Sequence, residues 1–131
     1  MPYIYNAVES LVTDPPKQNA GTGQCVALIE EYTTVPRPAA ATWKQGAVVR
    51  GSKTLEKGTA IATFVIGKYP SNASGNHAAF YLSEDANGIW VVDQYAGSGG
   101  IRKRHLRFKG EVSKGVYVDP SNNGDAFSVI E

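Results

Sequence analysis

Cys25, His77 and Asp93 are the residues of this chain that could together cleave an amide bond. Cys25 is the single cysteine, and His77 is one of two histidines. In such a reaction a thiolate attacks the carbonyl carbon, an imidazole transfers the proton, and a third polar group orients the imidazole. The side-chain types for a nucleophile, a general base and an orienting group therefore occur in that order along the chain.

The segment after Gly23 predicts an amphipathic helix that begins near Cys25. The residues expected on its inward face, at helical spacing, are Cys25, Leu28, Ile29 and Tyr32. Cys25 then lies in the first turn, where the positive end of the helix dipole lowers the pKa of a thiol. A lone cysteine at such a position is more often a small buried apolar residue. The prediction of a nucleophile therefore depends on His77 and Asp93.

The remaining elements are predicted from apolar runs and turn residues. They are a continuous apolar strand at 59–66, strands at 77–83 and 89–95 joined by a hairpin connection at 84–88, a basic strand at 102–109, and short closing strands at 115–119 and 127–130. Residues 39–58 predict a short helix and loops. Helices followed by antiparallel strands indicate an α+β fold. The length of 131 residues predicts a single domain over residues 1–131.

The predicted hairpin brings the histidine and the carboxylate together. Alternate residues of a strand face the same side, so the register decides which side chains meet. In one register His77 lies directly opposite Asp93. If Ser83 instead pairs with Ile89, Asp93 is the diagonal neighbour of His77. Both registers place Asp93 within reach of His77 and turn Gln94 to the other face of the sheet.

The composition is that of an ordinary globular protein. Hydrophobic residues make up 42%, charged residues make up 19%, and the formal net charge is +1. This balance argues against a dedicated nucleic-acid or membrane-surface protein. One cysteine excludes an intramolecular disulfide and a multi-cysteine metal site, and two histidines leave little material for a histidine-based site. We therefore expect no metal and no nucleic-acid partner.

No targeting or membrane-spanning segment is predicted. Residues 1–10 lack the basic and apolar regions of a signal peptide. The longest apolar run, residues 60–67, is far shorter than a membrane span. The expected protein is therefore made in the cytoplasm without a signal peptide and has no membrane span.

The residues around the predicted triad resemble the papain-like CHAP and NlpC-type amidases. The shared motifs are Gly-Gln-Cys at 23–25, Asn-His-Ala-Ala at 76–79 and Val-Asp-Gln-Tyr at 92–95. The resemblance covers residues 21–95 in order and topology. The chain departs from the family pattern at Asn76 and Ala78, where Gly and Val are usual, at Asp93, where Glu is commoner, and at Tyr95, which replaces Asn.

The resemblance implies a papain-like α+β fold, with N-terminal helices packed on an antiparallel sheet, and a cysteine amidase or peptidase that hydrolyses peptidoglycan peptides. The backbone N–H of Cys25 and a side-chain amide would hold the oxyanion. Gln24 is the candidate by resemblance, and Gln18 in the preceding loop is the alternative. No cofactor is needed for this reaction.

The chain is also similar to small bacterial proteins of this superfamily, some of which are peptidoglycan amidase toxins delivered by type VI secretion. This similarity implies export by a non-Sec route to the periplasm of a target cell. It also implies an inhibitor or immunity protein as a partner.

Other functions stay open from the sequence alone. A Cys-His-Asp triad also serves acyl transfer, and an inactive papain-like fold can act as a binding module. The basic run from Arg102 to Lys109 could bind phosphate, nucleic acid, an anionic cell-wall polymer or an acidic inhibitor protein. A solvated surface is the more common role of such a run.

Overall fold

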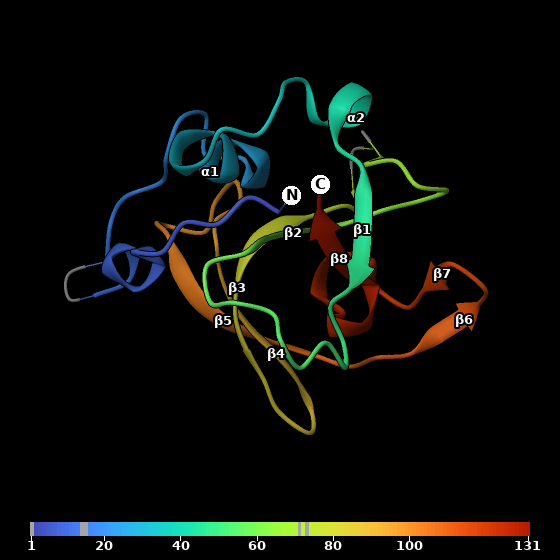
Figure 1. Cartoon of the computed structure of the whole chain (residues 1–131). Coiled ribbons are helices and arrows are strands. Elements are labelled where there is room, and N and C mark those ends of the chain that lie inside the picture. Colours follow the sequence, from blue (N-terminus) through green and yellow to red (C-terminus); the bar gives the residue numbers. More distant parts are fainter. Residues whose placement is uncertain (1, 14–15, 71, 73) are drawn as a thin grey trace.

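The computed structural model describes residues 2–13, 16–70, 72 and 74–131, and six antiparallel strands of this part of the chain form one curved sheet (Figure 1). The order across the sheet is β1-β8-β2-β3-β4-β5. The strands are β1 (Gln45–Val48), β2 (Ala60–Thr63), β3 (Ala78–Glu84), β4 (Gly88–Asp93), β5 (Arg102–Arg107) and β8 (Phe127–Ile130). A separate two-stranded ribbon comprises β6 (Glu111–Ser113) and β7 (Val116–Tyr117).

Short helices near the N-terminus cover one face of this sheet (Figure 1). They are the 3₁₀ helix η1 (Val8–Leu11) and the α-helices α1 (Cys25–Tyr32) and α2 (Ala39–Thr42). The core between helices and sheet includes Val8, Leu11, Leu28, Ile29, Trp43, Phe80 and Val92. Burial of these side chains anchors α1, because each removes apolar area from water.

A second core lies on the other face of the sheet. It includes Ile61, Ala79, Ile89, Val91, Leu106 and Phe127. Two further 3₁₀ helices, η2 (Pro120–Asn122) and η3 (Gly124–Ala126), lead into β8 on this side. Adjacent residues of β3 and β4 thus face two different cores, as the alternation of a strand requires.

The predicted α+β arrangement of N-terminal helices on an antiparallel sheet is confirmed. The helix begins at Cys25 as predicted, ends at Tyr32, and buries Leu28 and Ile29. The basic strand is present as β5, at one edge of the sheet. The strand at 59–66 is shorter than predicted, because residues 65–68 form a tight turn in which Ile66 and Gly67 have positive φ angles.

Two strands were not predicted. The segment 39–58 contains β1, and its pairing partner is β8, more than 80 residues further along the chain. Its residues are mostly exposed, so no apolar alternation marks it as a strand. The predicted closing strand at 115–119 is only β7, which pairs with the unpredicted β6 and not with the main sheet.

The register of the β3–β4 hairpin follows the diagonal prediction next to the site. Phe80 pairs with Val92, so Asp93 comes opposite Ala79 and diagonally across from His77. A bulge after Tyr81 shifts the pairing nearer the turn, where Ser83 faces Trp90 and not Ile89 as predicted. The shift lies beyond the site, so His77 and Asp93 keep the predicted common face.

Candidate active site

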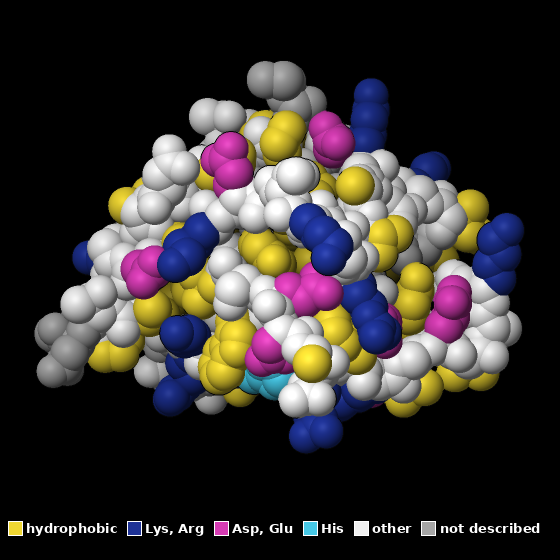
Figure 2. Space-filling model, turned by 60° about the horizontal axis from the view of Figure 1, so that its bottom comes forward, with side chains coloured by type: hydrophobic (Ala, Val, Ile, Leu, Met, Phe, Trp, Pro, Cys, Tyr) yellow, Lys and Arg dark blue, Asp and Glu magenta, His cyan; other side chains and the backbone are white. Residues whose placement is uncertain are grey.

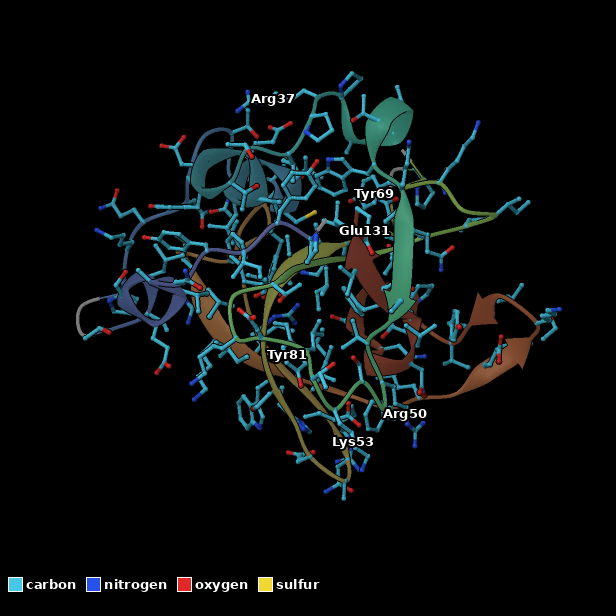
Figure 3. All side chains as sticks on the ribbon, in the orientation of Figure 1. Arg37, Arg50, Lys53, Tyr69, Tyr81 and Glu131 are labelled. Atoms are coloured by element: carbon cyan, nitrogen blue, oxygen red, sulfur yellow. The ribbon has the colours of Figure 1, made fainter. Side chains whose placement is uncertain are left out.

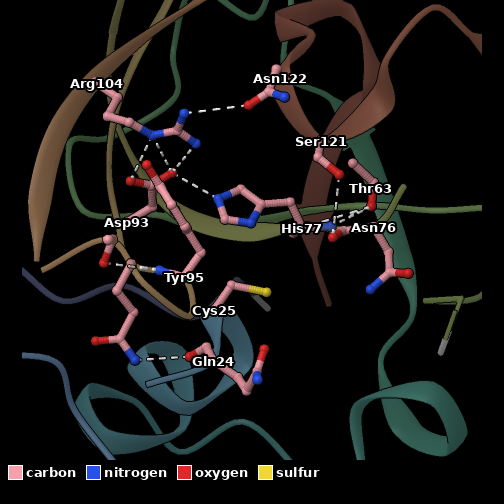
Figure 4. A network of polar contacts seen from close by, with 12 residues as sticks. Gln24, Cys25, Thr63, Asn76, His77, Asp93, Tyr95, Arg104, Ser121 and Asn122 are labelled. Carbon is pink, nitrogen blue, oxygen red and sulfur yellow. Dashed lines mark hydrogen bonds and ion pairs between the residues drawn. The ribbon is translucent and has the colours of Figure 1, made fainter. Parts of the chain in front are cut away.

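A polar cleft of about 440 Å³ opens where the N-terminus of α1 meets the ends of β3 and β4 (Figure 4). Cys25, His77 and Arg104 line it, together with Tyr95 of the chain after β4 and Asn122 of η2. The cleft is therefore built by residues from both ends of the described chain, and the sheet between them sets their positions.

Cys25 is the first residue of α1, directly after the N-cap residue Gln24, whose backbone is extended. The loop before it is held by Gln94, which is fully buried. The Gln94 amide accepts a hydrogen bond from the Ala20 N–H at 2.7 Å and donates to the carbonyl oxygens of Ala20 at 2.9 Å and Gln24 at 2.8 Å. The residue after Asp93 thus fixes the segment that presents the thiol.

His77 immediately precedes β3, and its backbone extends the pairing of β2 with β3. Its N–H donates to Thr63 Oγ1 at 3.0 Å, and its carbonyl oxygen accepts from the Thr63 N–H at 3.0 Å. The ring meets the edge of Phe127 at a centroid distance of 6.3 Å. The His77 residue is 4% exposed, so the protein encloses it almost completely.

His77 and Asp93 are in direct contact, as the predicted hairpin requires. His77 Nε2 lies 2.7 Å from Asp93 Oδ2, and the Asp93 side chain is fully buried. This contact occupies one ring nitrogen and leaves Nδ1 for the thiol (Figure 4). Cys25 and His77 line the same cleft, and the two groups lie close enough to shift each other's pKa. The structure brings all three predicted triad residues together.

The neighbours of each triad residue favour its charged form. Burial raises the pKa of the Cys25 thiol, but the adjacent His77, through its charge, and the Tyr69 hydroxyl outweigh burial and lower this pKa from its ordinary value. Burial lowers the pKa of His77, whereas hydrogen bonds and charges from Asp93 and Cys25 raise it to about 9. Between these two pKa values the pair is a thiolate and an imidazolium.

The buried carboxylate also stays charged. Burial raises the pKa of Asp93, but hydrogen bonds from His77 and Arg104 reverse the effect and lower it below 3.8. A carboxylate that is fully buried would otherwise be costly to keep ionised.

Tyr69 is a further contact of the Cys25 thiol. Its hydroxyl lies 3.6 Å from Cys25 Sγ and accepts a hydrogen bond from Asn76 Nδ2 at 3.3 Å. Burial and the charge of Cys25 raise the pKa of Tyr69 well above its ordinary value. The hydroxyl therefore keeps its proton and can donate a hydrogen bond to the thiolate.

Arg104 is the residue that the sequence prediction missed, since it lies within the basic run. Its Nε and Nη2 both donate to the Asp93 carboxylate. A signal was present: Leu106 marks the inward face of the strand, and counting back by two places Arg104 on the same face. Arg104 in fact pairs across the sheet with Val91, two residues before Asp93.

The two candidates for the oxyanion lie in different places. Gln24 lines the cleft beside Cys25. Gln18 lines another cavity together with Gly99 and Gly100, so the structure does not bring it to the thiol. The cause is the loop path: the backbone of the neighbouring Lys17 forms hydrogen bonds with Leu11 and Ile101.

The rest of the basic run has local partners. Arg102 donates to the Ser98 carbonyl at 2.6 Å, and Lys103 lies over the ring of Trp90. On the face in Figure 2, the described Lys and Arg side chains are interspersed with Asp and Glu and form no single basic patch. These observations favour a solvated surface for the run, with Arg104 as the exception.

A second cavity, of about 600 Å³, lies beside Lys53 and Tyr81. Figure 3 shows Lys53 at the end of the molecule opposite to Tyr69, and therefore away from Cys25.

Within the described residues, no cluster of three or more His, Cys, Asp or Glu side chains could hold a metal ion. No helix in the same part of the chain is long and apolar enough to cross a membrane.

Comparison with known proteins agrees with this geometry. The domesticated amidase effector 2 family matches residues 9–130. A type VI secretion amidase effector 2 protein of Salmonella typhi is 44% identical over 137 aligned positions, which cover 100% of both chains. A domesticated amidase effector 2 of Ixodes scapularis is 35% identical over 116 positions, covering 82% of this chain and 70% of the relative.

A solved structure, of type 6 secretion amidase effector 2, matches with a TM-score of 0.85 and 40% identity, over 98% of this chain and 94% of the other. This match confirms the expected papain-like α+β fold. The family match over nearly the whole chain and the identity of the relatives agree with each other, and on these grounds the chain belongs to the amidase effector 2 family.

Proposed function

We propose that this amidase hydrolyses amide bonds of peptidoglycan peptides with Cys25 as nucleophile, His77 as general acid and base, and Asp93 as the group that orients the imidazole. The observation that carries this proposal is the buried contact of 2.7 Å between His77 Nε2 and Asp93, which turns the other ring nitrogen to a thiol at the start of a helix. An inactive binding module would not need a buried carboxylate in this position.

The reaction begins with attack of the Cys25 thiolate on the amide carbonyl carbon. The backbone N–H of Cys25 lies at the helix start, where it has no partner within the helix, and can donate to the oxyanion. Gln24 is the side chain in the cleft that can add a second donor. His77 protonates the leaving amine, and the C–N bond breaks.

The second half of the reaction releases the acyl group. His77, now neutral, takes a proton from a water molecule that attacks the thioester, and the thiolate leaves as the carboxylate product forms. The imidazolium and thiolate are thereby restored. The raised pKa of His77, about 9, favours the protonated ring at the start of each cycle.

The substrate class is inferred from the relatives and from the cleft. Relatives are named as amidase effectors of type VI secretion or as domesticated forms. The cleft is lined mostly by polar side chains, among them Asn76, Ser121 and Asn122, which suit hydrogen bonds to a peptide backbone.

We propose export by the type VI route, action in the periplasm of a target cell, and an immunity protein as inhibitor.

The test is incubation of purified peptidoglycan with the wild-type chain and with Cys25→Ser, followed by mass analysis of the released fragments. The wild type is expected to release fragments cleaved at one kind of amide bond. Cys25→Ser is expected to lose turnover by about a thousandfold or more while keeping its fold, because an alkoxide is much harder to form than a thiolate. Retained turnover in this variant contradicts the mechanism.

The same experiment separates hydrolysis from acyl transfer. With a primary amine added, a hydrolase still yields free carboxylates. An acyltransferase yields products that carry the mass of the amine.

A further inference from the structure

The Asp93 carboxylate receives hydrogen bonds from two different cations. Oδ2 lies 2.7 Å from His77 Nε2 and 2.6 Å from Arg104 Nη2. Arg104 Nε lies 3.0 Å from each carboxylate oxygen. The guanidinium therefore binds the carboxylate through two nitrogens, and this geometry fixes the rotation of the carboxylate plane.

Arg104 is itself held in place on its other sides. Its Nη1 donates to Asn122 Oδ1 at 3.3 Å, and its guanidinium lies 5.1 Å from the ring centre of Tyr95. The side chain is 24% exposed and borders the cleft. It comes from β5, the strand next to that of Asp93, so sheet pairing fixes where its backbone lies.

The charges of the site alternate along one line of contacts. In the active form they are positive on Arg104, negative on Asp93, positive on His77 and negative on Cys25, which sum to zero. The titratable groups facing these residues from the neighbouring segments are Tyr69 beside Cys25 and Tyr95 beside Arg104. Without the guanidinium, the same buried site carries one net negative charge.

We propose that Arg104 is a positioning residue of the active site, which keeps the Asp93 carboxylate charged and turned so that Oδ2 faces His77. The proposal rests on the triad of the proposed function. Arg104 does not touch the reacting atoms. It acts through Asp93 on the orientation of the imidazole and on the pH range over which the thiolate–imidazolium pair exists.

A purely structural salt bridge would behave differently. Its loss would lower stability and the fraction of folded enzyme, and so the amount of activity, without moving the pH at which the thiol ionises. A role in positioning predicts a shift. Removing a cation from a buried site favours protonation of every remaining group, so the pKa values of Cys25 and His77 should both rise.

The experiment measures the alkylation rate of Cys25 by iodoacetamide and the turnover of a peptidoglycan peptide, both against pH. The variants are Arg104→Gln, which removes the charge, and Arg104→Lys, which keeps the charge but cannot bind the carboxylate through two nitrogens. Arg102→Gln is the matched control, because it removes the same charge from the same strand at a side chain that donates to the Ser98 carbonyl oxygen.

Arg104→Gln is expected to move both limbs of the profile to higher pH, by on the order of half a pH unit or more. Arg104→Lys is expected to keep the wild-type limbs and to lose about tenfold in maximal turnover, because one ammonium cannot hold both oxygens in plane. Arg102→Gln should match the wild type.

Unshifted limbs in Arg104→Gln, or full turnover in Arg104→Lys, would overturn the positioning role. If Arg104→Gln does not fold, the turnover of Arg104→Lys decides alone. Failure of the triad itself looks different: the wild-type thiol would then be alkylated like an ordinary cysteine, at a rate that rises only as pH approaches the ordinary pKa of a thiol. That result overturns the proposed function, and the role of Arg104 with it.

Discussion

Replacing Gln94 with Leu is expected to loosen the loop that presents Cys25, although Gln94 does not line the cleft. The two side chains have similar volume, so the main change is the loss of three hydrogen bonds to backbone groups of Ala20 and Gln24. Their lengths, 2.7–2.9 Å, are near the optimum for N–H···O bonds.

The expected magnitude follows from these contacts. Each net hydrogen bond contributes about 0.5–1.5 kcal/mol, and a buried backbone group left without a partner costs somewhat more. Because the Ala20–Gln24 loop is only partly buried, water can reach some of the exposed groups. The free energy of unfolding should therefore fall by about 2–4 kcal/mol, and turnover should fall with it as the thiol loses its fixed position.

Urea unfolding followed by tryptophan fluorescence measures the first effect, and peptide turnover under conditions where the variant is folded measures the second. Gln45→Leu is the matched control, because the Gln45 amide makes a single hydrogen bond, to Ser128 Oγ at 3.0 Å. It should cost about 1 kcal/mol or less. A loss below about 1 kcal/mol in Gln94→Leu, with wild-type turnover, would refute the role of Gln94 as the anchor of this loop.

Three further predictions concern the triad. Asp93→Ala should lower turnover by about tenfold to a thousandfold, less than Cys25→Ser, because the thiolate–imidazolium pair can persist without its orienting group; wild-type kcat/KM on a defined peptide would contradict the assignment. The pH profile of kcat/KM should fall at the alkaline end near pH 9, where His77 loses its proton, and at the acid end, where the thiolate of Cys25, whose pKa is lowered, becomes protonated. Stability measured by urea unfolding should follow the same groups: the raised pKa of His77 stabilises the fold below pH 6.5, and this contribution disappears as pH rises through about 9. The lowered pKa of Asp93 stabilises the fold above pH 3.8 and ceases to do so as pH falls through the native value. Activity that stays constant through pH 9 would show that His77 is not held as proposed.

Local patterns were enough to predict the elements that carry the triad. The spacing of Leu28 and Ile29 from Cys25 places the three residues on one face of a helix. This pattern can be read from neighbouring residues alone, because a helix is formed by residues close together in the sequence. Strand alternation likewise placed Asp93 on the same face as His77, and a bulge near the turn did not disturb this placement. Which face of a strand a residue occupies depends on the local alternation of side chains. This assignment therefore stays correct even where the exact pairing of the strands is predicted wrongly.

Features that depend on distant partners could not be predicted in the same way. β1 is a strand only because β8 pairs with it, and its own residues carry no apolar alternation. Gln18 was a reasonable oxyanion candidate by position in the loop, but the path of that loop depends on a backbone bond to Ile101. The sequence did not single out Arg104, because five other basic side chains occur in the same run, residues 102–109.

The place of β8 in the sheet has a consequence for the order in which the molecule assembles. This strand comes from residues 127–130 but lies between β1 and β2, and η2, just before it, contributes Ser121 and Asn122 to the cleft. During synthesis the sheet therefore has a gap next to β2 until nearly all of the described chain has emerged. Pairing across such a separation in sequence is slow compared with local folding. A nascent chain cannot hold His77 against Phe127 before that moment, so the hydrolase gains its catalytic geometry only after β8 has emerged and paired.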